Sequence, residues 1–399
     1  MFTMWKSVLL ILVVNFSFGQ NLERYKGYVD TLCSPYFFGR GYLKDGHRKA
    51  SDFLAQEFKN LGYQVKEQVF EFDVNTFPVA EDLLVNDSLV LKLGVDWIPN
   101  PASSSIEGIY KVFTLNDETI GDSVYMASFY NNEEPYILAN TSEHLPFEDK
   151  NYPNVMLELG GSLISNFSQS RVPLAVISVK KDSWKNSYTK IELKLKSELK
   201  RVVSRNIIAY SPNFSQKRKY KVVTGHYDHL GGYGNEVYIP GANDNASGVA
   251  MMLDLASDFQ DRNICFIAFA GEEVGLLGSK YFVEYPLFKL EKIDLVINLD
   301  LMGAGSQGLM VENGVELSKT YDLMTIINNE EAFVKEIKKR KNSPNSDHYP
   351  FSQKGVDAIF LYSLGKVGGY HNIFDVKEKL EYESYSSLYQ LINKFIKTY

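Results

Sequence analysis

The sequence predicts an α/β fold, a three-layer sandwich with a mostly parallel central sheet, into which a β-rich segment is inserted. From residue 206 onward, short apolar runs alternate with helix-like stretches, which is typical of parallel strands covered by helices. Between residues 85 and 195 the pattern changes to short strand-like runs separated by turns and prolines. We therefore expect one main α/β domain and one inserted segment.

Composition excludes several functional classes. The chain has 399 residues, of which 45% are apolar and 23% charged, as in a soluble globular protein that buries its own core. The net charge of -7 gives no basic face for nucleic acid. Two cysteines, Cys33 and Cys265, are too few for a disulfide scaffold in a chain of this length.

The first 19 residues have the features of an export signal. Lys6 precedes the apolar run 8–14, and the small residues Ser17 and Gly19 then predict cleavage after Gly19. Spanning a bilayer requires about 20 apolar residues, so this run is too short for a stable membrane anchor. We expect an exported protein, either periplasmic or secreted.

Residues 20–84 are expected to form the first part of the main domain. Five apolar residues fall on one face of a helix: Ala50, Phe53, Leu54, Phe58 and Leu61. Gly62 is placed to end this helix, and residues 63–74 alternate as an extended strand does. The insertion, residues 85–195, follows with strand signals at 89–91, 109–113, 174–179 and 191–196.

Residues 196–399 are expected to complete the main domain. Strands are predicted at 207–210, 221–224, 264–270, 293–299 and 357–362. Helices are predicted at 249–259, 275–285, 330–341 and over the last 20 residues. The first two strands are expected to be neighbours, because only the polar turn around 213–219 separates them.

Side chains that can bind metal follow three of these predicted strands. In chain order they are His226 and Asp228, then Glu272 and Glu273, then Asp300. Ligands bind beyond the carboxyl ends of strands in open α/β sheets, so these side chains should meet at one edge. Asp244 lies in the loop before the 249–259 helix, on the same side, and His348 and His371 are further candidates downstream.

This donor set suits a pair of zinc ions. Two imidazoles and three carboxylates from this set would supply nitrogen and oxygen ligands, and no cysteine is among the candidates. Asp244, Glu273 and Asp300 carry three negative charges, which one bridging hydroxide would bring into balance with two Zn²⁺ ions. A single divalent ion would leave an excess of negative charge.

Together these motifs resemble those of the M28 family of zinc-dependent exopeptidases, over residues 200–375 and more loosely over 25–75. The matching segments, in chain order, are 225–229 (GHYDH), 243–248 (NDNASG), 270–275 (AGEEVG), 298–303 (NLDLMG), 346–348 (SDH) and 370–371 (YH). The 85–195 segment falls where many relatives carry a protease-associated domain. The resemblance implies a dizinc metallopeptidase, and aminopeptidase action on a peptide or small amide.

The resemblance also implies roles for individual residues. Asp244 would bridge two ions, one completed by His226 and Asp300 and the other by Glu273 and His371. Glu272, beside a ligand but not itself one, would be the general base that activates metal-bound water. Asp228 is placed to accept the free ring N–H of His226. Tyr370 is a candidate donor to the oxyanion.

Other interpretations remain open at this stage. His348 is expected to line a pocket or serve structure, His229 to have no special role, and Asp347 and Asp375 to orient neighbouring histidines or not. A glutaminyl-cyclase-like transferase shares the fold and typically uses one zinc. A non-catalytic binding relative would usually lack ligands or the base, and none is missing here.

Overall fold

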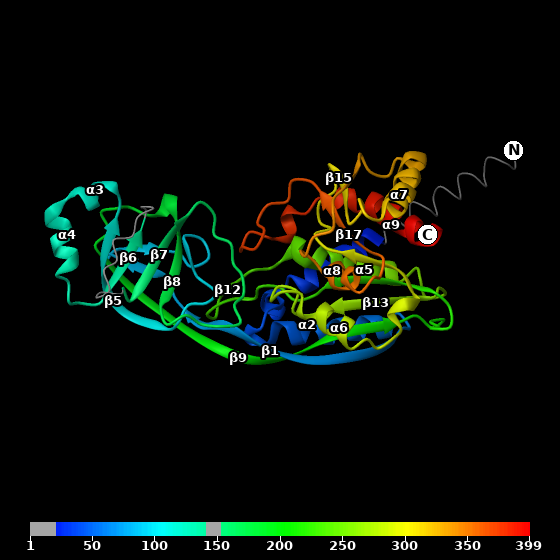
Figure 1. Ribbon diagram of the computed structural model, residues 1–399, viewed down its shortest axis with the longest axis horizontal. Helices are drawn as coiled ribbons and strands as arrows, with labels where there is room; N and C mark the ends of the chain where they lie inside the picture. The colour runs from blue at the N-terminus through cyan, green and yellow to red at the C-terminus, as the bar shows by residue number, and fades with distance from the viewer. Residues whose placement is uncertain (1–20, 141–152) are drawn as a thin grey trace, which may run out of the picture.

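The computed structural model describes residues 21–140 and 153–399 (Figure 1). The predicted export signal, residues 1–19, lies outside the described residues. Within the described residues, no helix has both the length and the apolar character needed to cross a membrane. The molecule is elongated, with the main domain at one end and the insertion at the other (Figure 1).

The main domain is built on a sheet whose central strands are parallel. β10 (Tyr220–His226) lies between β13 (Ile264–Phe269) and β14 (Ile293–Leu299), and it pairs in parallel with both. β14 pairs in parallel with β17 (Ala358–Leu364). Every residue of β13 is buried, as expected for a strand covered on both faces. The predicted fold class, a mostly parallel sheet in an α/β sandwich, is confirmed.

The two edges of this sheet are mixed in direction. On one side, β15 (Gly308–Glu312) pairs antiparallel with β17, and β16 (Ile337–Lys339) pairs in parallel with β15. On the other side, β13 pairs antiparallel with the long strand β9 (Lys190–Tyr210). A separate two-stranded ladder joins β11 (Gly232–Tyr233) to β12 (Val237–Tyr238).

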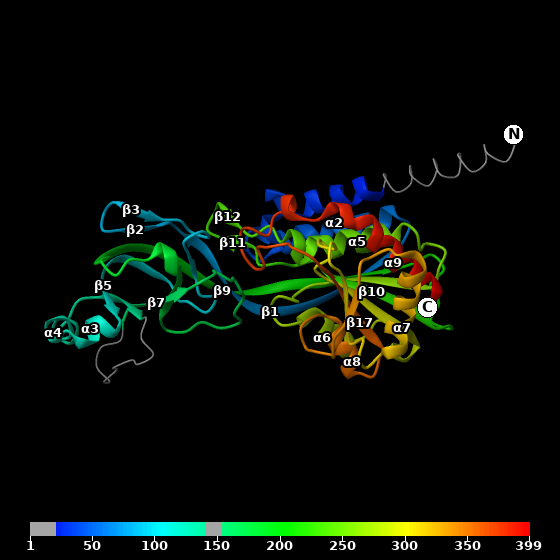
Figure 2. The same cartoon turned by 90° about the horizontal axis from the view of Figure 1, so that it is seen from above.

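Helices cover both faces of the sheet (Figure 2). One face is covered by helical residues 21–32 together with α2 (Gly46–Asn60), α5 (Gly248–Ala256) and α9 (Tyr385–Thr398). The other face is covered by α6 (Leu277–Glu284) and α8 (His348–Gln353), whose Phe282 and Phe351 pack on it. α7 (Ser318–Glu331) packs beside α9.

A long antiparallel ribbon joins the main domain to the insertion (Figure 1). β1 (Gln64–Ala80) pairs with β9 from Gln64–Tyr210 to Ala80–Leu195, with one irregularity between Thr76 and Val79. The near end of this ribbon is part of the main-domain sheet, and its far end belongs to the insertion. The two parts therefore share continuous strands.

The insertion has its own strands and its own apolar core. Its strands are β2 (Leu83–Val85), β3 (Leu89–Leu91), β4 (Trp97–Pro99), β5 (Ile106–Leu115), β6 (Tyr136–Asn140), β7 (Val155–Gly160) and β8 (Ala175–Lys180). Two short helices, α3 (Asp117–Gly121) and α4 (Ser123–Tyr130), follow β5. Trp97, Ile137, Val155 and Ile177 form the centre of the core.

Two predictions about the main domain are wrong. The strands at 207–210 and 221–224 are not neighbours, because β13 lies between β9 and β10. The helix predicted at 330–341 does not form: α7 ends at Glu331, where the predicted helix would begin, because Ala332 adopts a left-handed conformation. The residues beyond include strand β16, where Ile337 is buried against the sheet edge.

Candidate metal centre

The candidate ligands come together at one edge of the parallel strands. His226 ends β10, Asp300 follows β14 directly, and Glu273 lies four residues after the end of β13. Asp244 lies in a single helical turn, Ala242–Ser247, that leads into α5, and its peptide bond to Asn245 is cis. His371 lies in the loop after β17. Parallel strands place their carboxyl ends together, so the convergence follows from the topology.

The distances between the ligand atoms fall into two sets that share Asp244. His226 Nε2 lies 3.3 Å from Asp244 Oδ1 and 3.3 Å from Asp300 Oδ1. His371 Nε2 lies 3.1 Å from Asp244 Oδ2 and 3.2 Å from Glu273 Oε2. Tetrahedral zinc with bonds of about 2.0 Å separates its ligand atoms by about 3.3 Å. The donor types and their spacing therefore fit two zinc ions that share Asp244.

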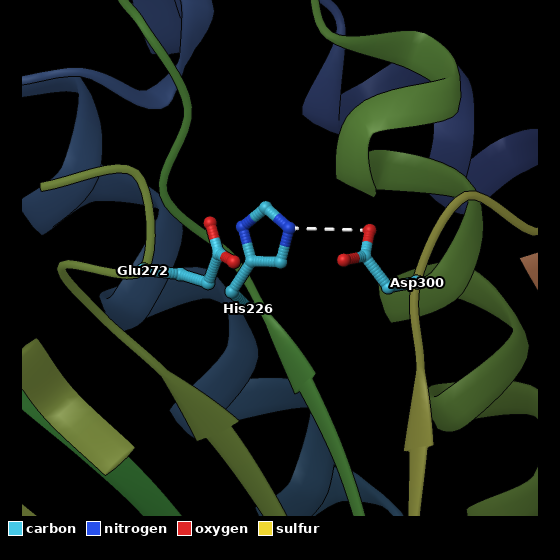
Figure 3. Close-up of side chains that lie close together, drawn as sticks. All are labelled: His226, Glu272 and Asp300. Atoms are coloured by element: carbon cyan, nitrogen blue, oxygen red, sulfur yellow. Dashed lines mark hydrogen bonds and ion pairs between the residues drawn. The ribbon is translucent and has the colours of Figure 1, made fainter. Parts of the chain in front are cut away.

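Glu272 lies beside the His226 half of this cluster (Figure 3). Ligand-type atoms of Glu272, His226 and Asp300 all lie within 4.8 Å of one another. Burial raises the pKa of the Glu272 carboxyl well above its usual range; His226 opposes this, and the charges of Glu273 and Asp347 add to it. Glu272 is thus a strongly basic carboxylate next to the candidate ions.

The role predicted for Asp228 needs correction. His226 Nδ1 donates to the main-chain carbonyl of Asp228 at 3.1 Å, whereas the Asp228 carboxylate is 4.0 Å away. The carboxylate instead accepts hydrogen bonds from Tyr42 Oη at 2.7 Å and from the Glu272 amide at 3.3 Å. Since the His226 ring turns toward the backbone, the carboxylate is left to fix the segment that carries Glu272.

Tyr370 lies at the surface of the site rather than inside it. Its side chain is 56% exposed, and its ring stacks on His371 with centroids 3.9 Å apart. Partial burial, together with nearby carboxylates, raises the pKa of Tyr370, so the hydroxyl keeps its proton. It can therefore donate a hydrogen bond to a substrate above His371.

His229 belongs to the site, although no special role was predicted for it. Its Nδ1 lies 2.6 Å from Glu273 Oε1, the oxygen that does not face His371. Burial lowers the pKa of His229 well below its usual range, so a neutral ring donates Nδ1–H to Glu273. The available signal was its position in the same turn as His226.

Three further residues hold the ligands from behind. Ser346 Oγ donates to Asp300 Oδ2 at 2.9 Å and accepts from Asn298 Nδ2 at 2.8 Å. Asp375 accepts from the amides of Asn243 and Asp244 at 2.8 and 3.0 Å, and so orients no histidine. Arg40 is fully buried and donates to main-chain carbonyls, including that of Asp244 at 3.1 Å.

His348 and Asp347 are buried next to the site without contacting the ligand atoms. His348 packs its ring 5.5 Å from that of Phe360, and burial lowers its pKa to about 4, so it is neutral. Burial raises the pKa of Asp347 to about 7. His348 therefore lies against Phe360, outside the two ligand sets.

Comparison with known proteins finds a family match over the part of the chain that carries this site. Residues 206–396 match the family described as Peptidase family M28. Aminopeptidase YwaD from Bacillus subtilis is 30% identical over 203 residues, which is 48% of this chain and 43% of YwaD. The chain thus spans less than half the length of this curated relative.

Solved structures share the fold over nearly the whole chain. A zinc aminopeptidase from Bacillus subtilis, BSAP, aligns with a TM-score of 0.68 at 20% identity, covering 94% of each chain. The glutaminyl cyclase from Porphyromonas gingivalis aligns with a TM-score of 0.53 at 13% identity, covering 94% of this chain and 98% of that one. The match over residues 206–396 contains all five candidate ligands and Glu272. Over residues 206–396, the chain is therefore similar to peptidase family M28.

Proposed function

We propose that the chain is a dizinc metallopeptidase that removes residues from the amino end of peptides. The observation that carries this proposal is the position of Asp244. Its Oδ1 lies 3.3 Å from His226 Nε2, and its Oδ2 lies 3.1 Å from His371 Nε2. A carboxylate that directs its two oxygens to different histidines is arranged to bridge two ions, with Asp300 and Glu273 completing the two halves.

The chemistry divides between the ions and the side chains. Bound zinc would supply Lewis acidity, which activates water and polarises the scissile carbonyl. The Glu272 carboxylate accepts the proton from the attacking water as the new C–O bond forms. It then gives that proton to the leaving nitrogen as the C–N bond breaks, which is the role its raised pKa suits. The Tyr370 hydroxyl donates to the carbonyl oxygen as negative charge develops there.

The charge of the site favours an amine over a carboxylate at the substrate terminus. Among the described residues, the ion pairs of Asp244, Glu273 and Asp300 are all with histidine. Glu272 and Asp347 add further acidic groups nearby. Two zinc ions and a bridging hydroxide would balance the charges of Asp244, Glu273 and Asp300, which leaves Glu272 and Asp347 to attract a protonated α-amine. A carboxypeptidase would instead need a cation for the substrate carboxylate. The site therefore supports aminopeptidase action.

The second candidate is a glutaminyl-cyclase-like transferase, favoured by the structural similarity to the Porphyromonas gingivalis enzyme. Such an enzyme would be expected to use one zinc ion. The two ligand sets around Asp244 favour the peptidase, because a one-ion site has no use for the second set.

One experiment distinguishes the two functions. Zinc per chain is measured after exhaustive dialysis. Turnover is then assayed with and without a chelator on three kinds of substrate: aminoacyl amides, peptides that report cleavage at the carboxyl end, and peptides with an N-terminal glutamine. We expect two zinc ions and hydrolysis of aminoacyl amides that chelation stops and added zinc restores. One ion with cyclisation of N-terminal glutamine would establish the transferase instead.

Export is a separate proposal, which rests on residues 1–19 of the sequence. N-terminal sequencing of the protein made in a bacterial host with an export pathway should find Gln20 as the first residue. A product that begins at Met1 would contradict it.

A further inference from the structure

The insertion reaches back to one of the candidate metal ligands. In the loop between β7 and β8, the Ser165 amide donates to the His371 carbonyl at 2.8 Å. His371 Nδ1 in turn donates to the Ser165 carbonyl at 3.0 Å, and the Asn166 Oδ1 lies 3.3 Å from the same nitrogen. One loop of the insertion thus holds both the backbone and the ring of His371.

The main domain fixes the position of this loop. Ser165 Oγ lies 2.5 Å from Tyr233 Oη, and Phe167 packs its ring 5.0 Å from that of Tyr42. The Asn75 amide donates to the Ser168 carbonyl at 2.8 Å. Ser165 is 4% exposed, so water does not readily replace these bonds. These contacts make the loop an integral part of the site.

The loop also supports the backbone conformation of His371. His371 has φ +55°, a left-handed conformation that is uncommon for a residue other than glycine. Surrounding contacts must hold such a residue in place. The hydrogen bond from the Ser165 amide to the His371 carbonyl is one of those contacts.

The other histidine needs no help from the insertion. The acceptor for His226 Nδ1 is the carbonyl of Asp228, two residues along the same loop. Asp300 is held by Ser346 and, through it, by Asn298, all within the main domain. The two halves of the centre therefore differ in what supports them.

We propose that Ser165 and Asn166 are positioning residues that make the Glu273–His371 half of the metal centre depend on the insertion. This inference rests on the proposed dinuclear function. A histidine that binds zinc through Nε2 must carry its proton on Nδ1, and the partner of Nδ1 fixes the ring. Here that partner is the insertion, so metal affinity in this half follows the position of the loop. The His226–Asp300 half keeps its affinity independently.

The test measures the two zinc affinities separately in the full-length protein. Zinc is withdrawn stepwise with a competing chelator from wild type, Asn166→Ala, Asn166→Asp and Ser165→Pro. Ser178→Ala, at a half-buried position of β8, is the control within the insertion, and Ser346→Ala is the matched control for the other half. Melting of the zinc-free forms shows whether each variant folds.

Loss of a hydrogen-bond partner behind a metal ligand typically costs about 10–100-fold in affinity. Ser165→Pro removes the amide donor, and we expect it to lower the affinity for one zinc ion by a factor within that range. Asn166→Ala removes one of two acceptors and should weaken the same ion by less, about 3–10-fold. Asn166→Asp keeps an acceptor, so we expect its zinc affinity to return to that of wild type. Ser346→Ala should weaken only the other ion.

The outcomes separate the two proposals. Two zinc ions with affinities unchanged in folded Asn166→Ala and Ser165→Pro would overturn this inference and leave the proposed function standing. Equal weakening of both ions would also overturn it. A wild type that binds one ion, weakened by these variants, would refute the dinuclear site while supporting the contact. One ion that neither variant affects would refute both.

Discussion

His229 donates a hydrogen bond from Nδ1 to Oε1 of Glu273 over 2.6 Å, while the other oxygen of Glu273 faces His371 at 3.2 Å. The first distance is that of a strong hydrogen bond, and the second is the spacing of two ligands on one zinc ion. His229 thus binds one oxygen of the Glu273 carboxylate, so the other oxygen remains available to bind metal.

Replacing His229 should therefore weaken the metal centre. In His229→Ala, Glu273 loses the donor that fixes it, and we expect zinc affinity in the Glu273–His371 half to fall about tenfold. His229→Asn places an amide donor near the position of Nδ1 and should retain most of the affinity. Chelator competition measures both. Full affinity in the alanine variant would show that Glu273 is held by other contacts.

Glu272→Gln should separate metal binding from turnover. Glutamine matches the shape of glutamate but cannot accept the proton, so kcat should fall by about 10²–10⁴-fold. Zinc content should remain unchanged, because Glu272 is not among the expected ligands. Steady-state rates and metal analysis of the same preparation check the two halves of this prediction. Normal rates would exclude Glu272 as the base.

Tyr370→Phe tests the donor at the surface of the site. The variant keeps the ring that stacks on His371 and loses only the hydroxyl. If the hydroxyl donates to the developing oxyanion, kcat should fall by about 10²-fold with little change in KM. A higher KM at an unchanged kcat would instead assign Tyr370 to substrate binding.

Arg40 should be one of the most sensitive positions in the fold. It is fully buried and donates to main-chain carbonyls on both sides of the site, among them Tyr227 at 3.0 Å and Gly241 at 2.7 Å. Lysine cannot reproduce this fork, so Arg40→Lys should lower the free energy of unfolding by about 2–4 kcal/mol. Urea unfolding measures this, with the exposed Arg48→Lys expected within about 0.5 kcal/mol of wild type.

Asp254 should make stability depend on pH. Burial raises its pKa to about 7, even though Arg24 pairs with it and Tyr385 donates to it. A carboxyl whose pKa is higher in the folded than in the unfolded state favours folding below pH about 4. That contribution is lost as pH rises to about 7, by up to about 1.4 kcal/mol per pH unit.

Asp254→Asn is the matched variant, since it cannot ionise. Between pH 4 and 7, the difference in unfolding free energy between asparagine and wild type should change in favour of asparagine as pH rises. A constant difference across this range would show that Asp254 titrates equally in both states. Chemical unfolding at several pH values provides the measurement.

The sequence predicted that the candidate ligands converge, because they lie at or near strand ends. His226 and Asp300 directly follow apolar runs that can only be buried strands, and parallel strands bring their ends together. Asp244 and Glu273 are adjacent to small-residue turns with the same placement. Such residues are found by local pattern, which needs no knowledge of distant contacts.

What the sequence could not supply are contacts that the fold alone creates. Ser165 meets His371 across 206 positions, from a segment with no motif. The ring of His226 turned toward a backbone carbonyl rather than the Asp228 carboxylate, a choice of rotamer that residue types do not encode. The helix predicted at 330–341 failed because burial of Ile337 at the sheet edge outweighed local helical propensity.

The shared strands of β1 and β9 have a mechanical consequence. A domain on a flexible linker can rotate about a hinge. The insertion, by contrast, continues from two strands that are hydrogen-bonded to each other along nearly their whole length. Rotation at one point would break several of these bonds at once, so displacement of the insertion must be spread as bending. The two paired strands should bend most easily at the irregularity between Thr76 and Val79.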